Sequence, residues 1–419
     1  MINLSDNKKT VKLYITTFFK WVFLGLTVGA VCGLIGFLFD KSVGIVTDFR
    51  AQNSWVLYLL PIGAMVSVGV YKLCGVCGVG TNQVFESVRS EQRVSPLLAP
   101  TVFIGSVITH LFGGSAGREG AALQIGGSIS AFLGELLKLD KKSRHILTVC
   151  GMAALFSAIF GTPLGALVFA IEVVSVGQIG SALFLPGIVA SITAYGFARF
   201  LGVEAEQFFV ENIPQFNFIT ILRVAVIAVI GAVISVFFCF AIRYTHKFFA
   251  KYFRNEFLRI SVGGVLIVLL TLVLGTTDYN GSGIEIINGI FKGEQVKYEA
   301  FLLKIIFTAI TVSVGFKGGE IIPTLFIGAT LGASLSGLLG LNPAFCAAIG
   351  MAALFCGVTN CPLATIVLFT ELFGTQSIIF IAFAGIISFF LSGYTGLYSG
   401  QHLVFSKFTE EEIDISPKE

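Results

Sequence analysis

The chain has 419 residues, of which 55% are hydrophobic and only 12% are charged, and its mean hydropathy is +0.90. Soluble domains carry about 25% charged residues, so the composition excludes a soluble protein and predicts a polytopic, all-α membrane protein. The net charge of +3 is spread along the chain and leaves no nucleic-acid footprint. The basic N-terminus, with Lys8, Lys9 and Lys12, leads into a long apolar segment without a small-residue cleavage site. We therefore expect a first membrane helix that starts in the cytoplasm, and not a signal peptide.

Apolar segments separated by glycine-rich or polar breaks follow one another along the chain. In order, they cover 12–39, 55–73, 95–112, 121–137, 145–160, 163–176, 181–200, 218–246, 260–274, 299–314, 324–339, 345–373 and 376–397. Segments 145–160 and 163–176 are too short and interrupted to be two ordinary spans, which favours broken and re-entrant helices. Among the breaks, 138–144 (KLDKKSR) is a basic hinge and 203–217 is a polar, acidic connector.

An internal repeat relates the two halves of the chain. The sequence GMAALF occurs at 151–156 and again at 350–355, and the same offset matches Pro163 with Pro362 and Glu172 with Glu371. A slightly different offset aligns LQIG at 123–126 with LFIG at 325–328, so that Gly117 falls against Gly319. We therefore predict a first repeat at 1–202, a connector at 203–217, a second repeat at 218–402 and a short tail at 403–419. Paired broken segments in two such repeats indicate the midplane site of a transporter. An odd number of crossings in each repeat would make the copies inverted.

The stretch 113–127 (GGSAGREGAALQIGG) places Arg118 and Glu119 between glycines, directly before an apolar helix. A charge at membrane depth is costly and usually marks an ion or proton pathway. The N-terminus of a helix offers unpaired N–H groups and a partial positive charge, which together bind an anion. We predict an anion site at the start of a broken membrane helix, with a carboxylate beside it. A purely structural Arg–Glu pair is the alternative.

The eight cysteines lie in apolar segments at irregular spacing, and no histidine or acidic residue at metal-ligand spacing follows Cys74 and Cys77. We interpret the cysteines as small core residues and expect no metal and no cofactor. The sequence holds neither paired catalytic carboxylates on neighbouring spans nor an HExxH pattern. We therefore do not expect an enzyme.

Three motifs and one tyrosine give the chain a family resemblance. The motifs are GVGTNQV at 78–84, GREG at 117–120 and GEIIP at 319–323, and Tyr398 follows in GLYSG. In this order they resemble the CLC family of anion channels and proton-coupled anion transporters, over nearly the whole chain. The resemblance implies a homodimer with one anion pathway per subunit. The expected location is the cell membrane, namely the bacterial inner membrane. It also implies that Glu119 is the gating and proton-exchanging glutamate and that Tyr398 supplies the inner hydroxyl that contacts the anion.

Departures from the family pattern bear on the choice of anion. Val79 replaces a serine, Ala121 replaces a proline, and Val173 stands where many proton-coupled chloride members carry a second glutamate. The third motif gains a carboxylate, Glu320. This combination resembles the fluoride-exporting branch, although that branch usually has Met or Asn at Val79 and often Thr at Ile322. We expect fluoride export coupled to proton influx; a chloride/proton antiporter or a passive chloride channel is the alternative.

The expected anion site is built from helix N-termini and one hydroxyl. Its residues are Val79, Gly80, Thr81, Asn82, Gly117, Arg118, Gly120, Gly319, Ile321, Ile322 and Tyr398. Glu119 can compete with the anion for the same N–H groups, and it leaves when protonated. Arg118 is interpreted as a fixed electrostatic partner more than as an anion ligand. Asn82 is either a side-chain donor or a helix cap.

Three other acidic or titratable features occur in the sequence. Glu320 is either a second proton carrier or a partner for Lys317, three residues earlier. Glu172 and Glu371 stand at matched repeat positions and are interpreted as making a shared structural bond to backbone or solvent. His110 is interpreted as a packed or interfacial histidine and not as a proton relay.

Overall fold

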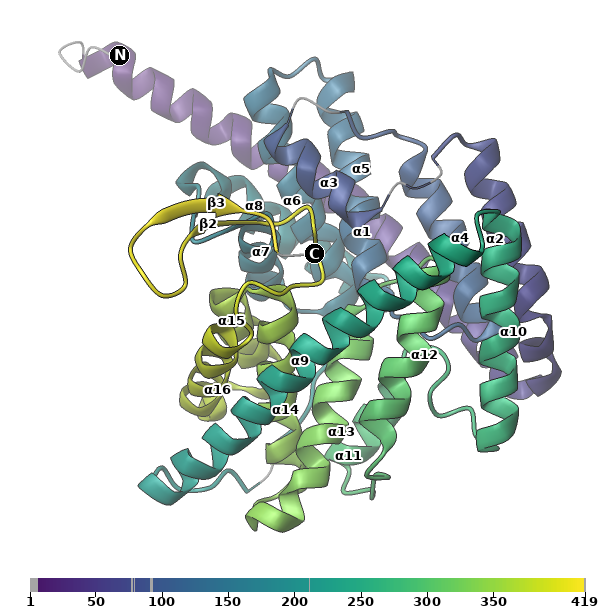
Figure 1. Cartoon of the computed structure of the whole chain (residues 1–419). Coiled ribbons are helices and arrows are strands. Elements are labelled where there is room, and N and C mark those ends of the chain that lie inside the picture. The colour runs from purple at the N-terminus through teal and green to yellow at the C-terminus, as the bar shows by residue number, and fades with distance from the viewer. Residues whose placement is uncertain (1–6, 77, 79, 91–92, 211, 418–419) are drawn as a thin grey trace.

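The computed structural model describes residues 7–76, 78, 80–90, 93–210 and 212–417 (Figure 1). The first-half helices are α1 (Asn7–Gln52), α2 (Leu60–Leu73), α3 (Thr81–Arg89), α4 (Leu98–Phe112), α5 (Glu119–Leu136), α6 (Lys141–Phe160), α7 (Pro163–Glu172) and α8 (Phe184–Phe200). The second-half helices are α9 (Phe218–Tyr252), α10 (Glu256–Leu274), α11 (Ile284–Phe291), α12 (Ala300–Val314), α13 (Ile321–Leu339), α14 (Pro343–Thr359), α15 (Pro362–Phe373) and α16 (Ile378–Leu391). Short 3₁₀ helices cover Ser54–Leu59, Ser181–Leu183 and Thr375–Ser377.

The helices confirm the prediction of an all-α polytopic membrane protein. Within the described ranges, seven helices are long and apolar enough to cross a membrane, and six shorter apolar helices accompany them. The long helices α1 and α9 run obliquely across the others in Figure 1. The predicted interruptions lie between α6 and α7 and between α14 and α15, where each second helix starts at a proline.

The two halves repeat the same packing pattern. Helix α5 packs on α6 as α13 packs on α14, α6 packs on α8 as α14 packs on α16, and α1 packs on α8 as α9 packs on α16. An isolated antiparallel bridge joins Gly117 to Gly319, the two glycines that the repeat alignment matches. This antiparallel pairing of matched residues is the one expected of two copies related by a pseudo-two-fold axis near the bridge.

The repeated GMAALF sequence is a packing motif. Helices α6 and α14 are buried along nearly their whole apolar length. A Cβ atom at Gly151 would lie 2.3 Å from the carbonyl oxygen of Gly126, and a Cβ atom at Gly350 would lie 2.2 Å from that of Gly328. These positions therefore allow only glycine, because the backbones of α5 and α6, and those of α13 and α14, are in direct contact. The contacts fix the direction of α5 and α13, whose N-termini meet at the bridge.

The matched glutamates Glu172 and Glu371 each cap a helix of the other half. Glu172, at the end of α7, accepts hydrogen bonds from the backbone N–H groups of Leu363 (3.2 Å) and Ala364 (2.7 Å). Glu371, near the end of α15, accepts from Leu164 (3.0 Å) and Gly165 (2.6 Å). The predicted shared structural bond is confirmed, and its partner is backbone. Because each helix ends where the other begins, α7 and α15 run antiparallel.

We expect Glu172→Ala to destabilise the protein more than Glu371→Ala. Each substitution leaves two N–H groups of a helix start without an acceptor, a loss of about 1–3 kcal/mol. The cost is larger at Glu172, which is 3% exposed, because water cannot reach the freed N–H groups there. Thermal unfolding in detergent measures the effect. Glu299→Ala is the control, since Glu299 precedes α12 without a side-chain capping bond; equal stability of all three variants would contradict the capping role.

A small sheet that the sequence analysis did not foresee holds the C-terminal tail. Strand β2 (His402–Phe405) pairs in parallel with β1 (Ser175–Val176) and antiparallel with β3 (Glu412–Ile415). Asp414 in β3 accepts from Arg89 at the end of α3 (3.0 Å) and contacts His402 Nδ1 (3.2 Å). The hydrogen bond from Arg89 lowers the pKa of Asp414. The tail therefore ties α3 to the segment that follows Tyr398.

Candidate functional site

The starts of α5 and α13 meet at the Gly117–Gly319 bridge. The N–H of Gly117 donates to the carbonyl of Gly319 (2.7 Å), and the N–H of Gly319 donates back to Gly117 (2.6 Å). Arg118 and Glu320 are the N-cap residues of the two helices, neither of which is capped by its own side chain. Two positive helix ends thus approach one point in the interior of a membrane protein, which is the arrangement expected of an anion site.

Helix α3 and the tyrosine segment complete the site. The amide Nε2 of Gln124, in α5, donates to Thr81 Oγ1 at the start of α3 (2.8 Å). Asn82 Oδ1 accepts from the N–H of Gly400 (3.1 Å), two residues beyond Tyr398. The cap interpretation of Asn82 is wrong, because the N-cap of α3 is Gly80 and no side chain caps that helix. Its side chain instead joins α3 to the tyrosine segment. Val79 lies outside the described residues.

Glu119 is folded back over the start of its own helix. Its Oε2 accepts a hydrogen bond from the backbone N–H of Arg118 (3.0 Å), and the residue is 1% exposed. The same oxygen lies 2.7 Å from where a Cβ atom of Gly117 would be. The carboxylate therefore occupies the position at the helix start that an anion would take.

Arg118 is held by carboxylates from three parts of the chain. Its guanidinium donates to Asp40 in α1 and to Glu206 in the connector (3.0 Å), and its Nε lies 3.5 Å from Glu119 Oε1. These contacts occupy the guanidinium, which supports the interpretation of Arg118 as a fixed partner and not as an anion ligand. The sequence analysis missed Asp40 and Glu206; the acidic character of 203–217 was the one available signal.

Glu320 directs a carboxylate toward the start of α5. Its Oε2 lies 3.5 Å from where a Cβ atom of Gly120 would be. This buried oxygen has no hydrogen-bond partner among the described residues. Lys317 acts on Glu320 electrostatically, while its Nζ lies 4.4 Å from the centre of the Tyr71 ring. The geometry is compatible with a proton carrier and with an electrostatic partner of Lys317.

Tyr398 brings a buried hydroxyl to the site. The residue is 3% exposed, and its hydroxyl has no partner in the described part of the chain. Its ring packs edge-on against Phe85 of α3, with ring centres 5.3 Å apart. Glu320 lies within electrostatic range of the hydroxyl. A buried hydroxyl with a free hydrogen is a compact donor for an anion.

A buried polar network, which the sequence analysis also missed, fixes the tyrosine segment. Asn360, in a left-handed conformation (φ 56°) at the end of α14, donates to the carbonyl of Thr395 (3.0 Å) and to Gln401 Oε1 (3.4 Å). Its Oδ1 accepts from Lys407 Nζ (2.6 Å), and Lys407 also donates to the carbonyl of Phe389 (2.7 Å). Burial lowers the pKa of Lys407 to about 7. The network therefore holds both ends of the segment that carries Tyr398.

Replacing Asn360 with glycine should destabilise the protein by roughly 2–4 kcal/mol, because the change leaves Lys407, Thr395 and Gln401 each short of a buried hydrogen-bond partner. Glycine keeps the left-handed backbone accessible, so the loss reports the side chain alone. Thermal unfolding measures it. Asn212→Gly is the matched control, since Asn212 has a nearly identical φ of 55° but is exposed. Equal effects of the two variants would contradict the network.

His110 behaves as the sequence analysis expected. It is 3% exposed, and its Nδ1 lies 2.8 Å from the carbonyl oxygen of Ser106, one turn earlier in α4. This bond is local and the ring is packed. Six of the seven cysteines within the described ranges are buried as well, in line with their interpretation as core residues.

Helix starts that converge near a buried carboxylate and a buried hydroxyl, inside a multi-pass membrane protein, are typical of a transport protein. The chain belongs to the voltage gated chloride channel family, whose model matches residues 62–393. This confirms the resemblance drawn from the motifs.

Relatives and solved structures agree with this assignment. The chain is 33% identical over 408 residues to the chloride/fluoride channel protein of Pseudomonas syringae pv. tomato, a match that covers 95% of this chain and 90% of that protein. It is 24% identical over 390 residues to the H(+)/Cl(-) exchange transporter ClcA of Vibrio cholerae, covering 84% and 82% of the two chains. A crystal structure of a CLC-type fluoride/proton antiporter superimposes with a TM-score of 0.88 at 30% identity, covering 91% of this chain and 98% of that chain. A slow cyanobacterial Cl-/H+ antiporter shares the fold, with a TM-score of 0.78 at 18% identity and coverage of 89% and 94%.

Proposed function

We propose that the protein exports fluoride in exchange for protons. One observation carries the proposal: the buried Glu119 carboxylate lies on the start of α5 and accepts a hydrogen bond from the N–H of Arg118, a donor that an anion at this helix start would also need. A carboxylate and a halide cannot share these donors. Protonation of Glu119 removes its charge and releases it from the helix start, and an anion then enters. One residue thus links proton uptake to anion movement.

Fluoride is the anion that the site chemistry favours. Fluoride is small and strongly hydrated, so a selective site must replace its water with compact donors, and helix N–H groups and the Tyr398 hydroxyl are donors of this kind. The gain of Glu320 supports the same choice, as do the similarity to a relative named chloride/fluoride channel protein and the similarity to a solved fluoride/proton antiporter. Val79 and Ile322 are the two positions that separate this chain from the usual fluoride pattern.

A chloride/proton antiporter or passive chloride channel is the second candidate. Relatives that are named as H(+)/Cl(-) exchange transporters align with most of this chain. The absence of the family's serine hydroxyl at position 79, where this chain has Val79, counts against this candidate.

Reconstituted liposomes test the proposal. The purified protein is reconstituted into vesicles that are loaded with fluoride or with chloride. Anion efflux from the vesicles and proton uptake into them are recorded together. The proposal expects fluoride efflux accompanied by proton uptake and a much slower chloride efflux. Chloride efflux as fast as fluoride efflux would favour the second candidate, a chloride transporter. Anion efflux without proton movement would identify the protein as a channel.

We expect Glu320→Gln to remove proton coupling while some anion flux remains. The carboxylate faces the first turn of α5 and has a buried oxygen without a hydrogen-bond partner among the described residues, so it is placed to exchange a proton near Glu119. The ratio of protons to anions in the same liposomes measures the effect. Lys317→Gln is the companion variant: if Glu320 is only the partner of Lys317, both variants lower thermal stability and neither alters the ratio.

We further propose a homodimer with one pathway per subunit, in a bacterial inner membrane with the N-terminus in the cytoplasm. The division into repeats at 1–202 and 218–402, connector 203–217 and tail 403–419 belongs to the same proposal. Large apolar side chains on the outer faces of α8 and α16, such as Ile192 and Ile379, support a lipid or subunit contact there. Cross-linking of single-cysteine variants in native membranes tests the dimer.

A further inference from the structure

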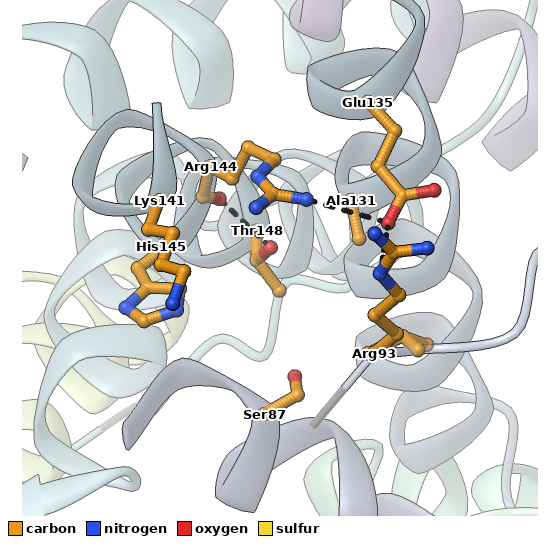
Figure 2. A pocket seen from close by; sticks show the side chains of 9 residues that line it. Ser87, Arg93, Ala131, Glu135, Lys141, Arg144, His145 and Thr148 are labelled. Carbon is orange, nitrogen blue, oxygen red and sulfur yellow. Dashed lines mark hydrogen bonds and ion pairs between the residues drawn. The ribbon is translucent and has the colours of Figure 1, made fainter. Parts of the chain in front are cut away.

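A basic cavity lies apart from the anion site, where the ends of α3 and α5 and the start of α6 lie near one another (Figure 2). Its volume is about 270 Å³. Lys141, Arg144 and His145 come from the first turns of α6, Glu135 comes from the end of α5, and Arg93 follows α3. Lys141 and Arg144 belong to the basic hinge 138–144, and His145 follows it directly. None of these three residues is part of the transport site.

Among the described residues that line the cavity, three side chains, Arg93, Lys141 and Arg144, are permanently cationic and one, Glu135, is a carboxylate. Arg93 and Arg144 both point to the same oxygen of Glu135, at 3.7 and 3.4 Å. Figure 2 shows this pair of ion contacts on one wall, with Lys141 and His145 together on the opposite side. The two arginines therefore share one carboxylate oxygen between them. The buried Nε of Arg144 has no hydrogen-bond partner in the described structure, so an N–H donor remains unused.

The position of the cavity matches the boundary between membrane and water. It is lined by the last turns of α5 and the first turns of α6, and α6 is one of the helices able to span a membrane. Lys20 of α1 lies within electrostatic range of Asp140, the N-cap of α6. The basic first part of α1 and the basic hinge therefore share one end of the bundle. Basic pockets at the ends of membrane helices hold the headgroups of anionic lipids.

We propose that this cavity binds a phosphate group, carried by an anionic lipid headgroup or by a soluble phosphate compound. Two arginine forks and a lysine that converge on one cavity match a tetrahedral, multiply charged oxyanion. A halide ion would leave most of the cavity empty. As a single spherical ion, it would also not need the paired N–H donors of a guanidinium group. Ser87 of α3 also lines the cavity, and the start of α3 faces the transport site. The proposal does not depend on which anion is transported.

Thermal unfolding in detergent, with and without added ligand, tests the proposal. The probes are short-chain phosphatidylglycerol, short-chain phosphatidylcholine and inorganic phosphate. We expect phosphatidylglycerol to raise the unfolding temperature of the unmodified protein by several degrees, and phosphatidylcholine to have little effect. A shift with inorganic phosphate equal to that with phosphatidylglycerol assigns the site to a soluble compound. No shift with either anionic probe overturns the proposal.

Two double variants localise the effect. The double variant Arg93→Gln/Lys141→Gln removes two charges that line the cavity, and both side chains are largely exposed, so folding is not at risk. The double variant Lys138→Gln/Lys142→Gln removes two exposed charges of the same hinge that do not line it. The shift should be lost in the first and retained in the second. Equal loss in both means a diffuse surface charge and no built site.

Discussion

Glutamine at position 119 should abolish the proton movement that accompanies anion efflux. The amide is the same size as the carboxylate, so the start of α5 keeps its shape, but the side chain can neither take up nor release a proton. Proton-transfer groups contribute about 10²–10⁴-fold to the processes they serve, and we expect the proton flux of Glu119→Gln to fall by roughly two orders of magnitude or more. Any anion efflux that remains should carry no protons. Simultaneous recording of both ions in liposomes measures this.

Glu172→Gln is the control for this experiment. Glu172 is also a buried glutamate in an apolar helix, but its carboxylate caps α15 and lies outside the site. The control should retain the proton-to-anion ratio of the unmodified protein even where its stability drops. If Glu119→Gln also retained that ratio, the Arg118–Glu119 pair would be a structural ion pair, and the gating role would have to be abandoned.

The internal repeat was the sequence feature from which contacts in the folded structure could be predicted. Close packing of α6 on α5 and of α14 on α13 leaves no room for any residue but glycine at 151 and 350, so the same letters recur in both halves. The second alignment, of LQIG at 123–126 with LFIG at 325–328, set Gly117 against Gly319, and these residues form the bridge. The structural role of the matched glutamates could also be predicted from the repeat, because a carboxylate that caps a helix must lie at a fixed distance from the end of that helix.

Contacts between distant segments without such a constraint were not predictable. Asp40 and Glu206 reach Arg118 from the end of the first apolar stretch and from the connector. Neither has a periodic or motif signature, since a salt bridge requires only proximity in space. Lys407 belongs to a short acidic tail, whose composition predicts an exposed side chain. In the structure its aliphatic stem is instead buried against α16, and its ammonium group donates a hydrogen bond to Asn360. Its role depends on the sheet formed by β1, β2 and β3.

Alanine at Gly319 should abolish transport while the chain still reaches the membrane. A Cβ atom there would lie 2.3 Å from the backbone nitrogen of Gly120 and 2.8 Å from its Cα. Real Cβ atoms do not approach backbone this closely, so the starts of α5 and α13 must move apart. That separation breaks both hydrogen bonds of the bridge with Gly117 and displaces the helix N–H groups that face the anion. Fluoride efflux from liposomes, normalised to the amount of reconstituted protein, measures the loss.

Gly337→Ala in the same helix separates this effect from the general cost of altering a glycine. No atom lies within 4 Å of a Cβ atom at Gly337, and alanine is a better helix former than glycine. This variant should transport at the rate of the unmodified protein. If Gly319→Ala did so too, the two helix starts would tolerate separation, and a site built on their convergence would be wrong. If both variants failed, α13 would be sensitive along its whole length, and the bridge would hold no special place in the mechanism.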